Sequence, residues 1–328
     1  MQIRKLAFLV LFLAAVTGLF FSHGLSLAVA KDDFPNRPIT FIAGWPGGGG
    51  GDREIRGFSL SLRKYLPVSL IIENVPGAAT KIAVTKAWKA KPDGYTLVYI
   101  TPPQQILNEF MTKTEYVTKD FVPVYSFMKR SFAMTVHSDS WKTVDEFIKA
   151  AKTRTLSVGL SSFGSAAHLE ALSAMKAWGL TVNFVPYETG SDAVMNVAGK
   201  HIDAAFTAAT TAIPLMRNGR IRALLKFSQT PVEGFENVPG PLELGYQIPI
   251  VNGLGGIVAP PKTPASVVKI LAEACAKTAK DPDFLSLAAK AQYEVIHLPS
   301  ADFKKELLEQ YKIVEENMPM IRASMPKK

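Results

Sequence analysis

The sequence predicts an α/β protein made of two domains. Short apolar runs typical of strands alternate with stretches of helical periodicity, and this order favours a parallel sheet with right-handed crossovers. The same rhythm repeats with new elements in the middle of the chain, which indicates a second α/β unit. At 328 residues the chain is also too long for one small core.

The elements are expected in the following order. The first unit has strands at 39–44, 68–73 and 95–100, with helices at 52–65 and 80–89. The second unit has strands at 132–136, 156–160, 182–185, 201–206 and 221–227, with helices at 143–152, 166–178, 191–199 and 209–218. After a surface loop at 231–249, a strand at 254–259 precedes helices at 265–280, 282–290 and 300–317. A strand followed only by helices makes sense if the chain returns to complete the first unit. We therefore assign 31–134 plus 255–328 to lobe 1 and 135–254 to lobe 2.

The first thirty residues have the features of a targeting segment. Arg4 and Lys5 precede a nearly uninterrupted apolar run at 6–21, and Ala28-Val29-Ala30 forms a small-x-small cleavage site. We predict a signal peptide at 1–30 that is cleaved on export to the periplasm. The alternative is an uncleaved membrane anchor, because the apolar run is long for a signal peptide. Against this alternative, a spanning helix needs about 20 apolar residues.

Composition argues against several classes of function. The formal charge is +9, but the 37 Lys and Arg are scattered singly among 28 acids, which argues against nucleic-acid binding. Cys275 is the only cysteine, so no intramolecular disulfide forms. No two histidines have a metal-ligand spacing, and we predict neither a metal nor a cofactor.

One stretch has the order strand, glycine loop, helix start. The strand is followed by Trp45 and Pro46, five glycines at 47–51, and Asp52 at the start of a helix. Backbone amides at such a helix start have no intrahelical partner and favour an anion. The loop lacks the Gly-Lys-Ser/Thr of a P-loop and the glycine spacing of a dinucleotide fingerprint. It is therefore either a general anion cradle or a flexible loop without function.

Two further small-residue turns follow predicted strands and precede helices, at 76–80 and at 161–165. Ligands of open α/β sheets bind outside the carboxyl ends of the strands. Several such loops together predict one ligand site.

A set of motifs resembles the Bug (TctC-type) family of extracytoplasmic solute-binding receptors. They are Phe34-Pro35-Asn36-Arg37-Pro38, Trp45-Pro46 with the glycines and Asp52, Glu73-Asn74-Val75-Pro76-Gly77-Ala78, and Ala90-Lys91-Pro92-Asp93-Gly94-Tyr95. The match continues through Gly164-Ser165 with His168, Val185-Pro186-Tyr187 and Val258-Ala259-Pro260, and it covers essentially the whole mature chain.

The resemblance implies a two-lobed, type II-like periplasmic-binding-protein fold with a ligand cleft between the lobes. It also implies a monomeric receptor, not an enzyme, that captures a small organic acid and delivers it to the membrane permease subunits of a tripartite tricarboxylate transporter. Lobe 1 would bind the ligand through Trp45, Pro46, Gly47, Gly48, Gly49, Gly50, Asp52, Gly77, Ala78, Thr80 and Lys81. Lobe 2 would supply Ser162, Gly164, Ser165, His168, Tyr187, Thr207 and Ala208.

This sequence departs from the family pattern where the family commonly has Gly-Gly-Asn. Here Ala79-Thr80-Lys81 occupies that place. We hypothesise that Lys81 pairs with a second anionic group of the ligand, and the alternative is a solvated lysine at a helix start. Trp45 forms either an apolar wall for the ligand or a packing contact.

Three alternatives remain open. His168 either reaches the ligand or bonds to the backbone near its helix start. An exported hydrolase would use Ser161, Ser162 or Ser165 with His168, although the sequence has no nucleophile-elbow motif there. A receptor that feeds a sensor protein would have the same sequence features as a transport receptor.

Overall fold

The structure is a computed structural model that describes residues 34–161, 163–228, 230–291 and 293–324. Pro35–Lys328 groups as one compact unit. The predicted signal peptide lies outside the described residues. Within those residues, none of the helices has both the length and the apolar character that crossing a membrane requires.

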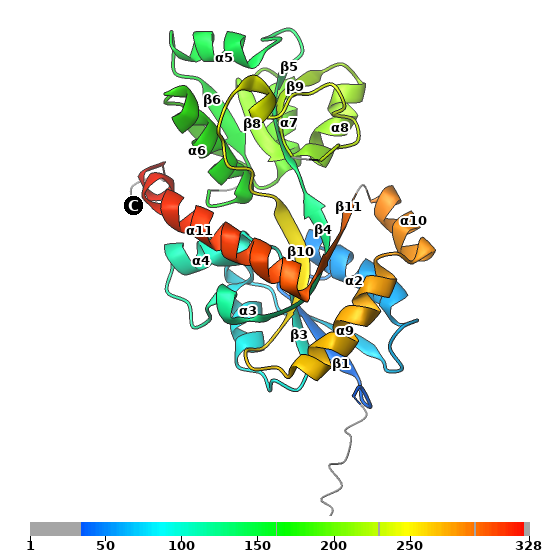
Figure 1. Cartoon of the computed structure of the whole chain (residues 1–328). Coiled ribbons are helices and arrows are strands. Elements are labelled where there is room, and N and C mark those ends of the chain that lie inside the picture. The colour runs from blue at the N-terminus through cyan, green and yellow to red at the C-terminus, as the bar shows by residue number, and fades with distance from the viewer. Residues whose placement is uncertain (1–33, 162, 229, 292, 325–328) are drawn as a thin grey trace, which may run out of the picture. The chain divides into compact units, whose positions relative to one another are not determined.

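The first sheet has six strands in the order β11-β4-β10-β3-β1-β2 (Figure 1). Its strands are β1 (Ile39–Ala43), β2 (Leu70–Asn74), β3 (Thr96–Ile100), β4 (Val122–Arg130), β10 (Gly253–Ala259) and β11 (Glu294–Pro299). The helices that belong to this part of the chain are α2 (Gly50–Leu62), α3 (Lys81–Trp88), α4 (Gln104–Met111), α9 (Ala265–Thr278), α10 (Pro282–Lys290) and α11 (Ser300–Ser324). β1 runs parallel to β2 and β3, whereas β10 is antiparallel to both β3 and β4.

The second sheet has five strands in the order β7-β6-β8-β5-β9. Its strands are β5 (Phe132–His137), β6 (Ser157–Leu160), β7 (Asn183–Pro186), β8 (Ala204–Ala208) and β9 (Ile221–Phe227). The accompanying helices are α5 (Val144–Ala151), α6 (Ala166–Trp178), α7 (Gly190–Ala198) and α8 (Ala209–Arg217). β6 is parallel to β7 and β8, and β5 is antiparallel to β8 and β9.

The predicted α/β, two-lobed fold class is confirmed, but the prediction of a parallel sheet is wrong in detail. Both sheets are mixed, because strands that carry the chain from one sheet to the other pair antiparallel with their neighbours. The sequence reading also passed over α4, β4 and β11. β11 lies between α10 and α11, so the chain does not finish in helices alone.

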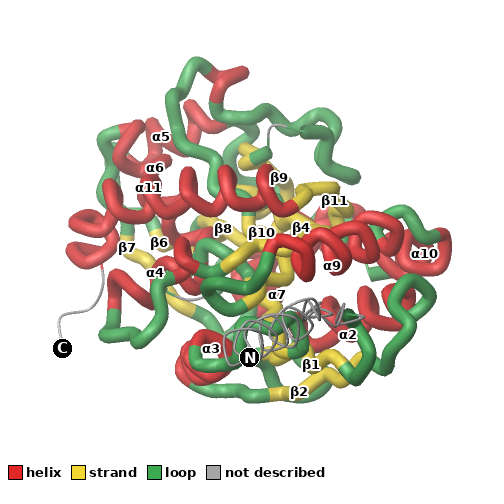
Figure 2. Tube along the Cα trace, turned by 60° about the horizontal axis from the view of Figure 1, so that its bottom comes forward, coloured by secondary structure: helices red, strands yellow, loops and turns green. Residues whose placement is uncertain are grey.

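α11 packs against elements from both parts of the chain. Its buried residues recur every three or four positions and so form one face, at Phe303, Leu307, Gln310, Val314, Met318 and Ile321. This face shares one apolar cluster with α4 and with Leu169 and Leu172 of α6. Figures 1 and 2 both show α11 running past α4 towards α6. The helix therefore joins the two sheets through buried apolar contacts.

The first passage between the sheets is a single residue, Ser131, between β4 and β5. Its amide and hydroxyl donate to the two carboxylate oxygens of Glu294, each at 2.9 Å. Its carbonyl accepts from the amide of Ala209, at the start of α8, at 2.8 Å. This short connection is thus held by groups from both parts of the chain.

Candidate ligand-binding site

The glycine loop leaves β1 after Ala43 and enters α2 at Gly50. Gly48 has φ +78°, a left-handed conformation that glycine adopts without steric cost. Gly51 lies against the Trp45 ring, and a Cβ at Gly51 would be 2.4 Å from the ring atoms. The Trp45 ring also contacts Tyr99, with ring centroids 5.7 Å apart. These contacts favour a packing role for at least one face of Trp45.

Asp52 holds the loop in place from the first turn of α2. Its carboxylate accepts from the Gly48 amide at 2.8 Å, from Asn74 Nδ2 at 2.8 Å and from Arg56 at 2.7 Å. Burial alone would raise the pKa of Asp52, but the hydrogen bonds from Arg56, Asn74 and Gly48 outweigh it and lower the pKa to about 2. Asp52 is therefore ionised at neutral pH and is engaged by protein donors, so its role is to position the loop.

This arrangement reduces the number of backbone amides in the loop that are available to an anion. The Gly48 amide is bonded to Asp52, and the Gly49 amide donates to the Pro46 carbonyl at 2.9 Å. Among the described residues, the amides of Gly47, Gly50 and Gly51 have no hydrogen-bond acceptor. The last two belong to the first turn of α2, where the helix dipole favours an anion.

The second loop of the site is the turn after β2. Ala78, Ala79 and Thr80 are consecutive non-glycine residues with positive φ values of 46°, 51° and 74°. Such conformations are costly for residues with a Cβ and cluster at functional sites. Here the side chains of the neighbouring α4 hold the turn.

Two buried amides of α4 maintain this turn. Asn108 Nδ2 donates to the Ala79 carbonyl at 2.8 Å, and Gln105 Nε2 donates to Thr80 Oγ1 at 2.9 Å. The turn also contacts the glycine loop, because a Cβ at Gly44 would be 2.6 Å from the Thr80 Cβ. The loops after β1 and β2 and the helix after β3 thus meet at one edge of the sheet.

Sequence reasoning missed Asn74, Gln105 and Asn108 as organisers of the site. Asn74 belongs to the motif at 73–78, but that motif does not indicate the hydrogen bond to Asp52. The signal for Gln105 was its position soon after the carboxyl end of the third strand, beyond Pro102 and Pro103. Polar side chains at that edge are expected to hold neighbouring loops.

Lys81 is the first residue of α3 and is half-buried. In the described part of the chain its ammonium forms no hydrogen bond or ion pair. Lys89 lowers the pKa of Glu115 through a hydrogen bond and its charge, and the charge of Lys81 adds a smaller effect in the same direction. Lys81 therefore lies within electrostatic range of Glu115 but remains available to another anion.

The loop after β6 leads into α6. Ser165 caps the helix, because its Oγ accepts from the His168 amide at 3.2 Å. Gly164 has φ +69°, and a Cβ there would be 2.6 Å from Sδ of Met111, the last residue of α4. The loop thus packs on the end of α4. Ser162 lies outside the described residues.

His168 supports this loop from the protein interior. Its side chain is 0% exposed and lies between the rings of Phe163 and Phe184. Nδ1 accepts from the Gly164 amide at 3.0 Å, and Nε2 lies 3.1 Å from Ser324 Oγ. Burial lowers the pKa of His168 to about 4, so the imidazole is neutral. These contacts give His168 a structural role in the loop, and a direct contact with a ligand stays a prediction.

The same bonds weigh against the exported hydrolase. In that hydrolase a ring nitrogen of His168 would be the base that activates the serine. Both nitrogens of His168 are engaged, one with Gly164 and one with Ser324. The Ser165 hydroxyl meets the amide of His168 and not its ring.

The remaining candidates follow β7 and β8. Tyr187 is half-buried, and its amide donates to the Leu160 carbonyl at 2.8 Å, which ties this residue to the end of β6. Thr207 is fully buried, and its hydroxyl donates to the Ala208 carbonyl at 3.4 Å. Ala208 ends β8 directly before α8. Among the described residues, no hydrogen bond or ion pair links these three to the glycine loop.

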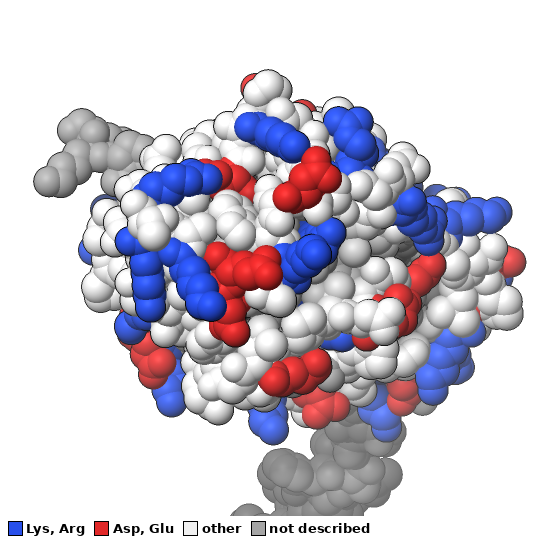
Figure 3. Space-filling model, turned by 90° about the horizontal axis from the view of Figure 1, so that it is seen from above, with Lys and Arg blue, Asp and Glu red and all other residues white. Residues whose placement is uncertain are grey.

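Charged side chains of both signs lie on the surface of the molecule. Figure 3 shows one face on which Lys and Arg are interspersed with Asp and Glu. Within the described ranges, no group of three or more His, Cys, Asp or Glu residues is arranged to hold a metal ion.

A glycine substitution tests the close contact between the loop and Trp45. We expect Gly51→Ala to lower the free energy of unfolding by about 1–3 kcal/mol, because the added methyl collides with the Trp45 ring. Gly50→Ala is the matched control, since a Cβ at Gly50 meets nothing within 4 Å. Denaturant unfolding monitored by tryptophan fluorescence measures both variants. Equal stabilities would contradict the described packing of Trp45.

Comparison with known proteins gives a consistent picture. A model of the family described as tripartite tricarboxylate transporter family receptor matches residues 55–322. The chain is 28% identical over 318 residues to the UPF0065 protein in the gbd 5′ region of Cupriavidus necator, covering 95% of this chain and 96% of that one.

Solved structures are also similar. A TctC solute-binding protein from Polaromonas, without ligand, has a TM-score of 0.78 and 28% identity, covering 86% of this chain and 99% of that one. MatC from Rhodopseudomonas palustris with bound malate has a TM-score of 0.69 at 22% identity, covering 86% and 100%. A second R. palustris structure, with adipate, has a TM-score of 0.70 at 23% identity, covering 86% and 98%. These last two establish likeness of fold.

Proposed function

Because this chain belongs to the tripartite tricarboxylate transporter receptor family, we propose that it captures a small organic carboxylate in the periplasm and delivers it to transporter permease subunits. The receptor is exported by a cleaved signal peptide at 1–30 and acts as a monomer. Lobe 1 comprises 31–131 plus 253–328, and lobe 2 comprises 132–252, so that β5 and β10 each stay whole within one sheet. The two lobes close on the ligand, and the closed form is the one that the permease recognises.

The observation that carries this proposal is the prearranged start of α2. Asp52 fixes the glycine loop, and the amides of Gly50 and Gly51 have no acceptor among the described residues. An anion at this position would gain hydrogen bonds and the favourable end of the helix dipole without reorganising the loop. The malate and adipate bound to similar structures are carboxylates, which supports the same ligand class here.

We assign the carboxylate contact to the loop at 45–50 and the turn at 77–80. Lys81 follows that turn directly and has no ion-pair partner in the described part of the chain. We propose that it binds a second carboxylate, so that dicarboxylates are preferred over monocarboxylates. Ser162, Gly164, Ser165, Tyr187 and the Thr207-Ala208 turn supply the lobe 2 side of the site.

A thermal-shift screen tests the proposal. Malate, adipate and citrate are compared with their uncharged amides, on protein that native mass spectrometry has verified to be empty. A ligand at 100 times its Kd stabilises the folded state by about 2.7 kcal/mol. We expect a carboxylate to produce such a shift and its amide to produce none. A screen in which no carboxylate stabilises the protein overturns the proposal, and chemical conversion of the bound acid identifies an enzyme instead.

A pair of lysine variants tests whether Lys81 binds a second carboxylate of the ligand. Lys81→Gln is expected to weaken a dicarboxylate more than a monocarboxylate of the same length. Lys91→Gln removes an exposed lysine elsewhere in lobe 1 and leaves both affinities unchanged. Equal affinities in wild type and Lys81→Gln would assign Lys81 to the solvated surface.

A further inference from the structure

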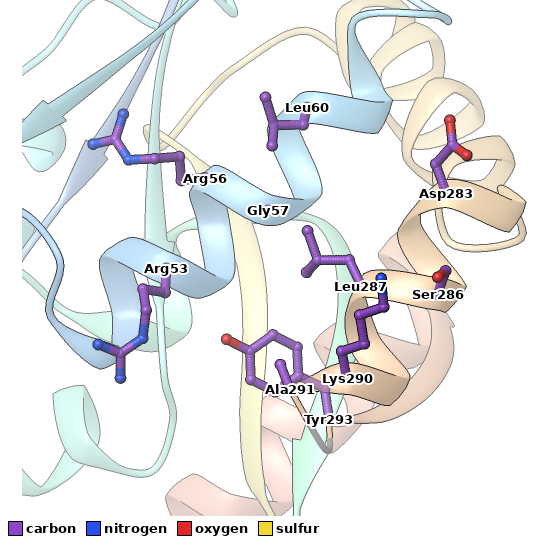
Figure 4. A pocket seen from close by; sticks show the side chains of 10 residues that line it. All are labelled: Arg53, Arg56, Gly57, Leu60, Asp283, Ser286, Leu287, Lys290, Ala291 and Tyr293. Atoms are coloured by element: carbon purple, nitrogen blue, oxygen red, sulfur yellow. The ribbon is translucent and has the colours of Figure 1, made fainter.

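A concave surface lies between α2 and α10, beyond the glycine loop. It has a volume of about 560 Å³ and combines apolar and cationic side chains. Its lining residues are Arg53, Arg56, Gly57, Leu60, Asp283, Ser286, Leu287, Lys290, Ala291 and Tyr293. Figure 4 shows Leu287 and Lys290 of α10 facing Gly57 of α2, with the Tyr293 ring below them. We call this surface the α2–α10 groove.

The floor of the groove is apolar because the two helices approach closely. A Cβ at Gly57 would be 2.8 Å from Leu287, so the glycine admits that side chain. Leu60 is 56% exposed at one end of this floor. Covering such an exposed aliphatic side chain with another apolar group lowers the free energy.

The charges of the groove are predominantly positive. Lys290 is exposed and pairs with no acid in the described part of the chain. The one acid in the lining, Asp283, is already paired with Lys64 at 2.6 Å. Arg53 uses one nitrogen to donate to the Gly48 carbonyl at 2.5 Å, which leaves its other donors available. Uncompensated positive charge beside an apolar floor favours a ligand with one anionic end and one apolar end.

We propose that the α2–α10 groove binds a small amphipathic anion of the medium-chain carboxylate class. The head group binds Arg53 at one end of the groove, and the alkyl tail covers Leu287 and extends towards Leu60. Lys290, beside Leu287, adds positive charge along the side of the groove. The groove volume falls within the range of small-molecule sites. Arg53 and Leu60 are separated by about 10 Å along α2, which is the length scale of such a tail.

This groove is coupled to the glycine loop through Gly48. The Gly48 carbonyl accepts from Arg53, and the Gly48 amide donates to Asp52, which also pairs with Arg56. A carboxylate bound to the other donors of Arg53 adds a partner to the side chain that holds the Gly48 carbonyl. Occupation of the groove therefore changes the surroundings of a loop that lies outside it.

Octanoate is the probe. Titration followed by NMR of the Leu287 methyl groups and the Gly48 amide is expected to show saturable shifts at both residues. Octanol keeps the tail without the charge, and acetate keeps the charge without the tail. Each is expected to bind at least tenfold more weakly than octanoate. Equal binding of octanoate and octanol would overturn the assignment of the cationic end.

Paired variants localise the binding. Lys290→Gln and Leu60→Ser are expected to weaken octanoate at least fivefold. Lys280→Gln and Leu285→Ser change exposed residues of the same types outside the groove lining and should leave octanoate affinity unchanged. If the groove variants bind octanoate as wild type does, or if Leu287 does not shift, the proposal fails. Dicarboxylate capture is measured separately by thermal shift, so failure at the groove leaves the proposed receptor function standing, and the reverse holds as well.

Discussion

Asp52→Ala is expected to lower the free energy of unfolding by about 2–3 kcal/mol at neutral pH and to abolish carboxylate binding. The ionised side chain is 2% exposed and accepts hydrogen bonds from Gly48, Asn74 and Arg56. Removing it leaves the Gly48 amide without its acceptor and frees the glycine loop from α2. Urea unfolding at pH 7 measures the stability, and calorimetry with the best carboxylate from the screen measures binding.

The pH dependence of this effect has a defined sign. The pKa of Asp52 is lowered from 3.8 to about 2 in the folded state. Its contribution to stability is therefore fully present above pH 3.8 and is lost as the pH falls through about 2. The difference between wild type and Asp52→Ala should shrink over that range.

Two variants separate the effect of the Asp52 hydrogen bonds with Gly48, Asn74 and Arg56, here called the network, from the effect of the helix dipole. Asp52→Asn is expected to be nearly as damaging, because all three partners are donors and an asparagine amide presents a donor to at least one of them. Asp302→Ala removes an exposed acid from the first turn of α11 and tests the helix dipole alone, which contributes at most about 1 kcal/mol at an exposed site. A loss in Asp302→Ala equal to that in Asp52→Ala would show that the network adds nothing.

The sequence predicted the elements whose pattern is local. β1 and α2 bracket a glycine run, and the alternation of apolar runs with helical stretches continues through the second sheet. β4 and β11 were missed because each contains a proline, Pro123 and Pro299, and each pairs with strands far away in sequence. α4 was missed because it begins directly after Pro102-Pro103, which reads as a turn. Pairing direction in a mixed sheet depends on such long-range partners.

The candidate site was predictable as a place but not as a set of contacts. Loops at the carboxyl ends of parallel strands must meet at one edge, and the contact of Gly44 with Thr80 is of this kind. Which groups are already engaged is not encoded locally. Asp52 depends on Asn74, and His168 depends on Ser324 at the other end of the chain. Both side chains therefore have internal supporting roles that their local sequence does not reveal.

His168 is expected to make the protein lose about 3 kcal/mol of stability as the pH falls from 6.5 to 4. Burial lowers the pKa of the folded-state imidazole from 6.5 to about 4. Over this interval the unfolded chain binds a proton that the folded protein does not, so stability is complete above pH 6.5 and decreases towards pH 4. Urea midpoints at half-unit pH steps, with two-state fits, measure this slope.

Glu170, two residues further along α6, changes the stability with pH in the opposite direction to His168. It is 0% exposed, burial raises its pKa well above 4.5, and its Oε1 accepts from the Val251 amide at 3.1 Å, which opposes the rise. The folded protein therefore holds a proton that the unfolded chain releases above pH 4.5, and stability falls as the pH rises. The measured slope in wild type is the sum of the two contributions.

Two variants separate the contributions of His168 and Glu170 to the pH slope. His168→Asn keeps an acceptor for the Gly164 amide but does not titrate, so it should remove the acid-side loss whatever its absolute stability. Glu170→Gln keeps an acceptor for the Val251 amide and should make the acid-side loss steeper, since the opposing contribution is gone. A His168→Asn variant with the same pH slope as wild type would place the histidine in solvent and return it to the list of residues open to a ligand. Opposite changes of slope in the two variants would confirm that burial shifts the two groups in opposite directions, the pKa of His168 downward and the pKa of Glu170 upward.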